Sequence, residues 1–315
     1  MINVTIKQAE SNFKMYLYRE GKANSTAEAY MRDIEFFKNF LKDNLNNKIR
    51  YINQITLVEI RQYKDYMLSL VESGETKRTT VSRRFNSLKT FYNFLEEEFN
   101  IKNIIKGDKF GNRKQSIDCR NALPEVLSRR EIKVILDTIR NSNNKNKYRD
   151  YALFQILVNL GCRRSEVLEL KWEDVDFYKN TIRITREKTS NADILPLPSP
   201  VKEALEGYMD TLPQMGEYIF QTRESGKMSV SAFTSTVNKW IKESKMEEIK
   251  GFKITAHTFR HSFITELINK NIEESKIIRY TGHKDIRTLK IYTHLNHSNL
   301  SDVNSIIEDL FQEAM

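Results

Sequence analysis

The stretch GCRRSEVLELKWEDVD, residues 161–176, lies where the sequence pattern of the chain changes from helical to strand-like. Apolar residues recur at helical spacing from Leu127 to Leu170. Residues 181–185 then alternate apolar and polar side chains, and a second short apolar run at 194–197 follows a polar turn, which predicts a β-hairpin. The helical pattern returns after Pro200. We therefore expect this part of the chain to be mainly α with a small β-sheet.

The first part of the chain, residues 1–100, is predicted to be a helical domain. Its apolar residues recur at helical spacing up to about Phe99, with almost no glycine or proline among them. This pattern predicts about four helices, with Thr56 and Thr76 as the N-caps of the third and fourth. Residues 101–122 lose the periodicity and are rich in lysine and arginine, which predicts an extended basic linker.

The remainder of the chain is expected to form a second domain, residues 123–300, followed by a terminal helix at 301–315. Apolar residues of that helix occupy one face, at the i, i+3, i+4, i+7 and i+8 positions: Val303, Ile306, Ile307, Leu310 and Phe311. Such a helix docks either on the core of its own chain or on a neighbouring protomer. The sequence leaves both arrangements open.

The charge of the chain favours a polyanionic partner. Lysine and arginine number 51 against 42 acidic residues, a formal net charge of +9, and nucleic acid is the leading candidate. No acidic residue occurs between positions 76 and 90. The basic side chains of that segment are either a solvated helix face or phosphate contacts, and on a basic helical domain we favour phosphate contact. They are Lys77, Arg78, Arg83, Arg84 and Lys89.

Cysteine content and hydropathy indicate a cytosolic protein. Cys119 and Cys162 are the only two cysteines, too few for a disulfide framework, which fits a reducing compartment. The N-terminus lacks an apolar signal segment, and no window of about 18 apolar residues occurs in the sequence. Neither secretion nor a membrane partner is therefore expected.

Six residues of the second domain have the chemistry needed to transfer a phosphoryl group without a metal ion: Arg163, Lys188, His257, Arg260, His283 and Tyr292. Two arginines can hold a phosphate, because the planar guanidinium pairs with it bidentately and stays charged. A tyrosine hydroxyl, with its pKa near 10, attacks only when a base takes its proton, and His257 is the candidate base. Lys188, on the hairpin turn, is expected to protonate the leaving oxygen. This chemistry needs no cofactor.

The histidines and the paired arginines also allow other interpretations. All five histidines lie between positions 257 and 297, and His257 and His261 are spaced i, i+4, which suits zinc. No glutamate lies between them and no other compact ligand set exists, so a metal is not expected, and His261, His294 and His297 are interpreted as structural. Arg163 and Arg164 are adjacent arginines, and nothing but spacing selects Arg163.

The order and spacing of these residues resemble those of the tyrosine recombinases, the phage integrase and Xer group. His283 lies 23 residues after Arg260, and Tyr292 lies nine after His283, as in that family. The segments 163–166 and 171–176 also resemble the sequence that flanks the family's first catalytic arginine. Residues 5–99 look like its helical core-binding domain, so the resemblance covers nearly the whole chain.

The resemblance implies a role for each matching residue. Arg163 is the first catalytic arginine, Glu166 supports the active site, and Lys188 is the hairpin lysine. His257 and Arg260 form the His-x-x-Arg pair, His283 stands at the second histidine position, and Tyr292 is the nucleophile. The chain departs from the family at Glu187, where glycine usually precedes the lysine, and in lacking the proline common after the first domain.

The resemblance also implies a fold and a reaction. A helical core-binding domain and a mixed α/β catalytic domain would enclose double-stranded DNA at a specific site. A homotetramer on two DNA sites would exchange strands through a 3′-phosphotyrosyl link and a Holliday junction, with or without an accessory protein, at the nucleoid in the cytoplasm. The outcome is either integration and excision of a mobile element or Xer-like dimer resolution. Because the chain starts almost at the core-binding domain, we expect an Xer-like system rather than a lambda-like one.

Two rival functions share this fold or these residues. The first is a catalytically silent, sequence-specific DNA-binding protein, which would lack one of the catalytic groups, and none is missing. The second is a type IB topoisomerase, which relaxes supercoils as a monomer. The helical first domain and the terminal helix favour recombination over relaxation.

Overall fold

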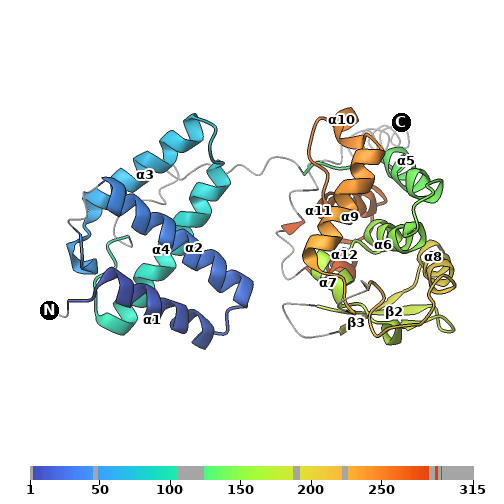
Figure 1. Ribbon diagram of the computed structural model, residues 1–315, viewed down its shortest axis with the longest axis horizontal. Helices are drawn as coiled ribbons and strands as arrows, with labels where there is room; N and C mark the ends of the chain where they lie inside the picture. Colours follow the sequence, from blue (N-terminus) through green and yellow to red (C-terminus); the bar gives the residue numbers. More distant parts are fainter. Residues whose placement is uncertain are drawn as a thin grey trace, which may run out of the picture. The chain divides into compact units, whose positions relative to one another are not determined.

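The computed structural model describes residues 3–44, 49–105, 124–186, 192–221, 226–283, 288–289 and 292. The chain divides into two compact units, Met1–Ala122 and Leu123–Met315, which are considered one at a time (Figure 1). Lys188, His294, His297, most of the predicted linker and the predicted helix at 301–315 lie outside the described residues. Within the described ranges, no helix is both long and apolar enough to span a membrane.

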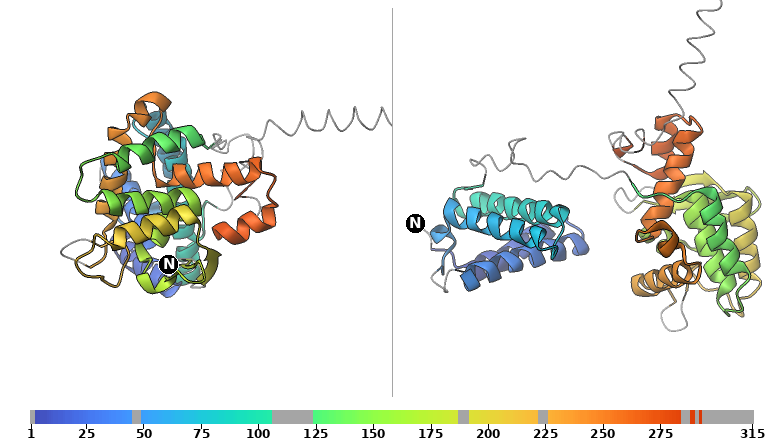
Figure 2. Two further views of the ribbon diagram at one scale, coloured as in Figure 1. Left: turned by 90° about the vertical axis from the view of Figure 1, so that its right-hand side faces the viewer. Right: turned by 90° about the horizontal axis from the view of Figure 1, so that it is seen from above.

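The first unit is a bundle of helices, in line with the prediction from its apolar spacing. Its described elements are α1 (Ile6–Arg19), α2 (Asn24–Asn44), the short 3-10 helix η1 (Ile52–Gln54), α3 (Leu57–Glu72) and α4 (Arg78–Phe99). Figure 2 shows the four α-helices packed along one another. Their core is rich in aromatic rings: Phe13 lies 5.1 Å from Phe91 and 5.3 Å from Phe94, measured between ring centroids.

Two of the predicted helix starts have different outcomes. Thr56 caps α3 as predicted, because its side chain accepts a hydrogen bond from the Val58 amide and Glu59 bonds back to the Thr56 amide. The prediction for Thr76 was wrong, since α4 begins after Lys77. The amide of Thr76 instead donates to the Leu70 carbonyl at 3.0 Å, so this residue closes the turn that ends α3.

The residues directly after α4 pack onto the first unit, although the sequence placed them in the linker. Ile105 is buried in the core of the unit, with Ile101 and Ile104 packed against it. The side chain of Asn103 ties this segment down, accepting from the Ile105 amide at 2.9 Å and donating to Asn93 at 2.8 Å.

The second unit surrounds the buried helix α6 (Lys147–Leu160). This helix packs against α5 (Arg129–Arg140), α8 (Ser199–Met209) and α11 (Ala256–Asn269). The other described helices are α7 (Arg164–Glu169), the 3-10 helix η2 (Trp172–Asp174), α9 (Val230–Glu243), α10 (Met246–Lys250) and α12 (Glu274–Thr281). Phe259 of α11 packs edge-on against Phe154 of α6, with ring centroids 5.4 Å apart, and this contact fixes the face that α11 turns to the core.

A small antiparallel sheet lies at the edge of the second unit (Figure 1). Its strands are β1 (Val175–Asp176), β2 (Thr181–Thr185) and β3 (Ala192–Pro196), in the order β1-β2-β3. Ile182 pairs with Leu195 across the predicted hairpin, and both side chains are buried. The expected fold class, mainly α with a small sheet, is confirmed.

Candidate active site

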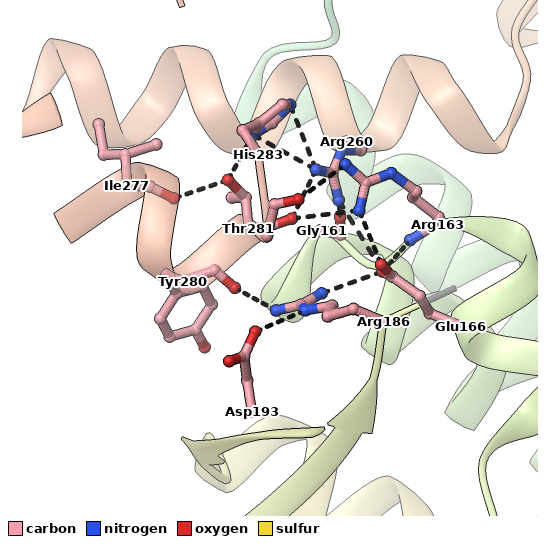
Figure 3. Close-up of polar contacts among 11 residues, drawn as sticks. Gly161, Arg163, Glu166, Arg186, Asp193, Arg260, Ile277, Tyr280, Thr281 and His283 are labelled. Carbon is pink, nitrogen blue, oxygen red and sulfur yellow. Dashed lines mark hydrogen bonds and ion pairs between the residues drawn. The ribbon is translucent and has the colours of Figure 1, made fainter. Parts of the chain in front are cut away.

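A buried glutamate lies at the centre of a cluster of arginines in the second unit (Figure 3). The side chain of Glu166, on α7, is fully buried. Its carboxylate accepts from Arg163 Nη1 at 2.8 Å and lies 3.1 Å from Arg186 Nη1 and 4.0 Å from Arg260 Nη1. It also accepts from the Arg163 amide at 2.7 Å, which makes Arg163 the N-cap of α7. Since Arg186 also pairs with Asp193, two carboxylates balance three guanidinium groups, and the remaining positive charge favours an anionic ligand.

The carbonyl oxygens at two helix ends hold the arginines in place. Arg260 donates to the carbonyls of Gly161 and Thr281, each at 2.7 Å, and Arg163 donates to the carbonyl of Gly282 at 3.1 Å. These oxygens lie at the C-termini of α6 and α12, where the last carbonyls lack partners within the helix and carry partial negative charge. The helix ends therefore orient cationic side chains that come from distant parts of the chain.

Two glycines allow these helix ends to approach so closely. Gly161 and Gly282 have φ angles of +57° and +64°, in the left-handed region where glycine is favoured. A Cβ on Gly161 would lie 2.5 Å from Phe263, and one on Gly282 would lie 2.7 Å from Arg186 Nε. Any larger residue would therefore strain the backbone and push on the groups packed around the arginines.

The structure distinguishes Arg163 from Arg164, which the sequence alone could do only by spacing. The Arg163 side chain is 28% exposed and turns toward Glu166 and α12, whereas Arg164 is exposed on the surface of α7. Burial and the nearby charge of Arg163 lower the pKa of Arg260 to about 10. Arg260 thus stays protonated at neutral pH. Arg163 keeps part of its side chain exposed to solvent.

Arg186 is a member of the cluster that the sequence analysis missed. It donates to Asp193 at 2.8 Å and to the Tyr280 carbonyl at 2.6 Å, and its side chain is 7% exposed. Burial alone would lower the pKa of Arg186, but Asp193 and Glu166 outweigh it and raise the pKa. Strand alternation could have predicted that Arg186 is buried, because residues 182, 184 and 186 lie on the same, inward face of the strand.

His283 follows the end of α12 and contacts Arg260. Its Nδ1 lies 2.6 Å from the Thr281 hydroxyl, and its Nε2 lies 3.2 Å from Arg260 Nη2. Burial, together with the charges of Arg260 and Arg163, lowers the pKa of His283 to about 3. The imidazole is therefore neutral at physiological pH and accepts rather than donates toward Arg260.

The low pKa of His283 predicts an acid-sensitive second unit. In the unfolded chain this histidine has an ordinary pKa of 6.5, so below that pH the unfolded state binds a proton that the folded state excludes. The free energy of unfolding is expected to be highest above pH 6.5 and to fall as the pH drops toward 3. Urea unfolding of the wild type and of His283→Asn, from pH 7 to pH 4, measures this effect. A shallower pH dependence in the variant is expected, and parallel curves would contradict it.

The ring of Tyr292 packs in an apolar cluster, and its hydroxyl forms a hydrogen bond with a histidine. The residue is 2% exposed and packs among Ile264, Ile268 and Ile277. Its hydroxyl forms a short hydrogen bond with Nδ1 of His261, and the two ring centroids are 5.6 Å apart. Burial raises the pKa of Tyr292, and the charge of Arg260 acts against this rise.

His257 lies one helical turn before His261 on α11, and it is exposed. The two histidine rings are 6.4 Å apart between centroids. Partial desolvation and then the charges of Arg260, Arg164 and Arg163 lower the pKa of His257. The histidine that contacts the Tyr292 hydroxyl is therefore His261, which the sequence indicated as structural, and the role of His257 as the base stays a prediction.

The five basic residues predicted to contact DNA have different surroundings in the first unit. Lys77, Arg78 and Lys89 are exposed on or beside α4. Arg83 forms an ion pair with the buried carboxylate of Asp33 and keeps half of its side chain exposed, so it can also meet solvent. Arg84 is only 17% exposed, lies 3.9 Å from Asp33 and stacks 3.5 Å above the Phe36 ring, which gives it a packing role.

Comparison with known proteins identifies the family. The model described as "Phage integrase family" matches residues 125–299, and that described as "Phage integrase, N-terminal SAM-like domain" matches residues 11–98. The chain therefore belongs to the phage integrase family. It is an enzyme of the tyrosine recombinase class, and the family predicted from the order and spacing of its residues is confirmed.

Named relatives and solved structures resemble the chain over nearly its full length. Tyrosine recombinase XerC of Pediococcus pentosaceus is 27% identical over 301 residues, covering 93% of this chain and 95% of the relative. Tyrosine recombinase XerD of Staphylococcus epidermidis is 28% identical over 287 residues, covering 89% and 91%. The XerH site-specific recombinase bound to a palindromic difH substrate has a TM-score of 0.72 at 21% identity and covers 96% of this chain and 85% of that one. The Tn1549 transposon integrase with circular intermediate DNA gives 0.72 at 19% identity, covering 97% and 99%.

Proposed function

We propose that this protein cleaves and rejoins double-stranded DNA at a specific site through a covalent bond to Tyr292. The observation that carries the proposal is the cluster of Arg163 and Arg260 around Glu166, formed in the same unit as a tyrosine whose hydroxyl bonds to a histidine of α11. The solved structures of XerH and of the Tn1549 integrase hold DNA, which supports DNA as the substrate here.

The reaction needs an anion site, a nucleophile and a proton donor. The non-bridging oxygens of the scissile phosphate would meet Arg163 and Arg260, with His283 beside them. The Tyr292 oxygen would attack phosphorus, His257 would receive the phenolic proton, and the bond from phosphorus to the 5′-oxygen would break. Lys188 is proposed to protonate that 5′-oxygen. The 3′-phosphotyrosyl link keeps the energy of the broken ester, so a 5′-hydroxyl can reverse the step.

Strand exchange places further requirements on the assembly. We propose that four protomers act on two DNA sites and pass through a Holliday junction, with the segment 301–315, predicted from sequence to be a helix, contacting a neighbouring protomer. The biological outcome would be integration and excision of a mobile element or Xer-like resolution of dimers at the nucleoid, with an accessory protein where the DNA site requires one. Deleting residues 301–315 should abolish the assembly of two DNA sites and leave binding to one site intact.

The first unit is proposed to bind the DNA backbone through α4 and the residues before it. Lys77 and Arg78 are exposed, and each phosphate contact that is lost should flatten the log-log dependence of affinity on salt by about 1. The double change Lys77→Gln and Arg78→Gln is therefore expected to reduce the slope by about 2. Lys7→Gln with Lys14→Gln, two exposed positions on α1, is the matched control. If the two double variants showed the same dependence of affinity on salt, the proposal that α4 binds the DNA backbone would be wrong.

The proposed function is tested by trapping its intermediate. Nicked duplexes that tile the DNA flanking the gene are incubated with the full chain, because a nick beside the cleavage point releases a short strand and blocks the reverse step. An SDS-resistant adduct is expected from the wild type and not from Tyr292→Phe. Specific binding by both proteins, with no adduct from either, would favour the silent DNA-binding protein instead.

A further inference from the structure

His261 lies in a position to act on the nucleophile itself. It follows Arg260 on α11, and successive residues of a helix are rotated by about 100°, so the two side chains face different ways. Arg260 turns to the ends of α6 and α12, whereas His261 is half-buried and turns to Tyr292. The same short segment of helix thus supplies one group to the phosphate site and another to the tyrosine.

The surroundings of His261 favour its neutral form. The titratable and charged groups that face it are His257 and Arg260 from α11, His283 from the end of α12, and Tyr292. Desolvation, and then His257 and Arg260, lower the pKa of His261. A neutral imidazole whose Nδ1 faces the hydroxyl can accept its hydrogen bond there while carrying a proton on Nε2. Nδ1 of His261 is therefore unprotonated and can accept the proton of the Tyr292 hydroxyl.

We propose that the phenolic proton of Tyr292 passes first to His261 and from there to His257. The O–H bond of Tyr292 breaks as its oxygen forms the bond to phosphorus, and the proton forms a new bond to His261 Nδ1. The proton on Nε2 then leaves to His257, one helical turn away on the same face, which is exposed and can exchange it with solvent. This inference rests on the proposed function and makes His261 a catalytic residue.

Two substitutions at His261 separate hydrogen bonding from proton transfer. In His261→Asn, the amide oxygen can take the place of Nδ1 and hold the hydroxyl but cannot accept its proton. The rate of adduct formation on a nicked duplex is measured in a single turnover from pH 6 to pH 10. We expect His261→Asn to be slower by about 100-fold at pH 7, the size usual for loss of a general base. The deficit should shrink as the pH rises, because hydroxide then removes the proton.

His257→Asn is the matched control on the same helix. Its deficit is expected to be smaller, because solvent can take the proton from His261 directly. His261→Gln, with melting temperature recorded for every variant, provides a second comparison if the first variant folds poorly. A wild-type rate for either folded His261 variant at all pH values would overturn the inference, as would a larger deficit in His257→Asn. Absence of any adduct from the wild type would instead overturn the proposed function.

Discussion

Glu166→Gln is expected to lower the free energy of unfolding of the second unit by about 3–5 kcal/mol, the usual cost of removing one partner from a buried ion pair. The carboxylate is fully buried and lies within 4.0 Å of three guanidinium groups, those of Arg163, Arg186 and Arg260. An amide of the same shape removes the only carboxylate near Arg163 and Arg260 that the described residues provide, whereas Arg186 keeps its ion pair with Asp193. DNA cleavage should also fall, because Arg163 loses the carboxylate to which it donates and Arg260 loses a nearby negative charge.

Tryptophan fluorescence during urea unfolding measures the free energy of unfolding of the second unit. The two tryptophans of the chain, Trp172 and Trp240, both belong to the second unit, so the signal excludes the first. Glu169→Gln is the matched control on the same helix, since Glu169 is 52% exposed and paired with Lys227 at the surface. Such surface pairs contribute about 1 kcal/mol or less. Equal losses in the two variants would show that Glu166 is not the centre of the cluster.

Arg260→Lys is expected to reduce DNA cleavage by on the order of 10²–10³-fold while leaving DNA affinity nearly unchanged. Arg260 uses separate nitrogens to reach Gly161 and Thr281, and a single ammonium group cannot reproduce that geometry. The charge is retained, so the defect should appear in the rate of the chemical step. Single-turnover cleavage at saturating enzyme separates this rate from binding.

Arg164→Lys provides the control for a change from arginine to lysine near the site. Arg164 is exposed and immediately follows Arg163, so its guanidinium has no comparable fixed geometry. Its replacement should change cleavage only a few-fold. A large loss in Arg164→Lys with little loss in Arg260→Lys would mean that the phosphate site has been assigned to the wrong side chains.

The sequence predicted the fold well where apolar periodicity is strong. The helical first unit and the hairpin of Ile182 and Leu195 follow from local spacing, and local spacing is the signal that secondary structure leaves in a sequence. The start of α4 could not be predicted to the residue. Thr76 has the chemistry of a cap, but its amide is already used by the Leu70 carbonyl in the preceding turn.

The sequence singles out candidate site residues only where they stand in a recognisable order. Arg186 and His261 were missed because their importance comes from contacts across the chain, with Glu166 in one case and Tyr292 in the other. An arginine beside a strand is usually solvated, and a histidine within a helix is usually structural. Arg84 has basic sequence neighbours, yet it packs on an aromatic ring, and its contact with DNA stays a prediction.

The proposed covalent bond between Tyr292 and DNA is tested most directly by locating the residue that carries the nucleotide. The adduct trapped on a nicked duplex is digested with nuclease and protease, and the peptide that carries the nucleotide is sequenced by mass spectrometry. We expect a nucleotide joined by its 3′-phosphate to Tyr292. A phosphate on any other residue, or a 5′-phosphate on Tyr292, would contradict the proposal.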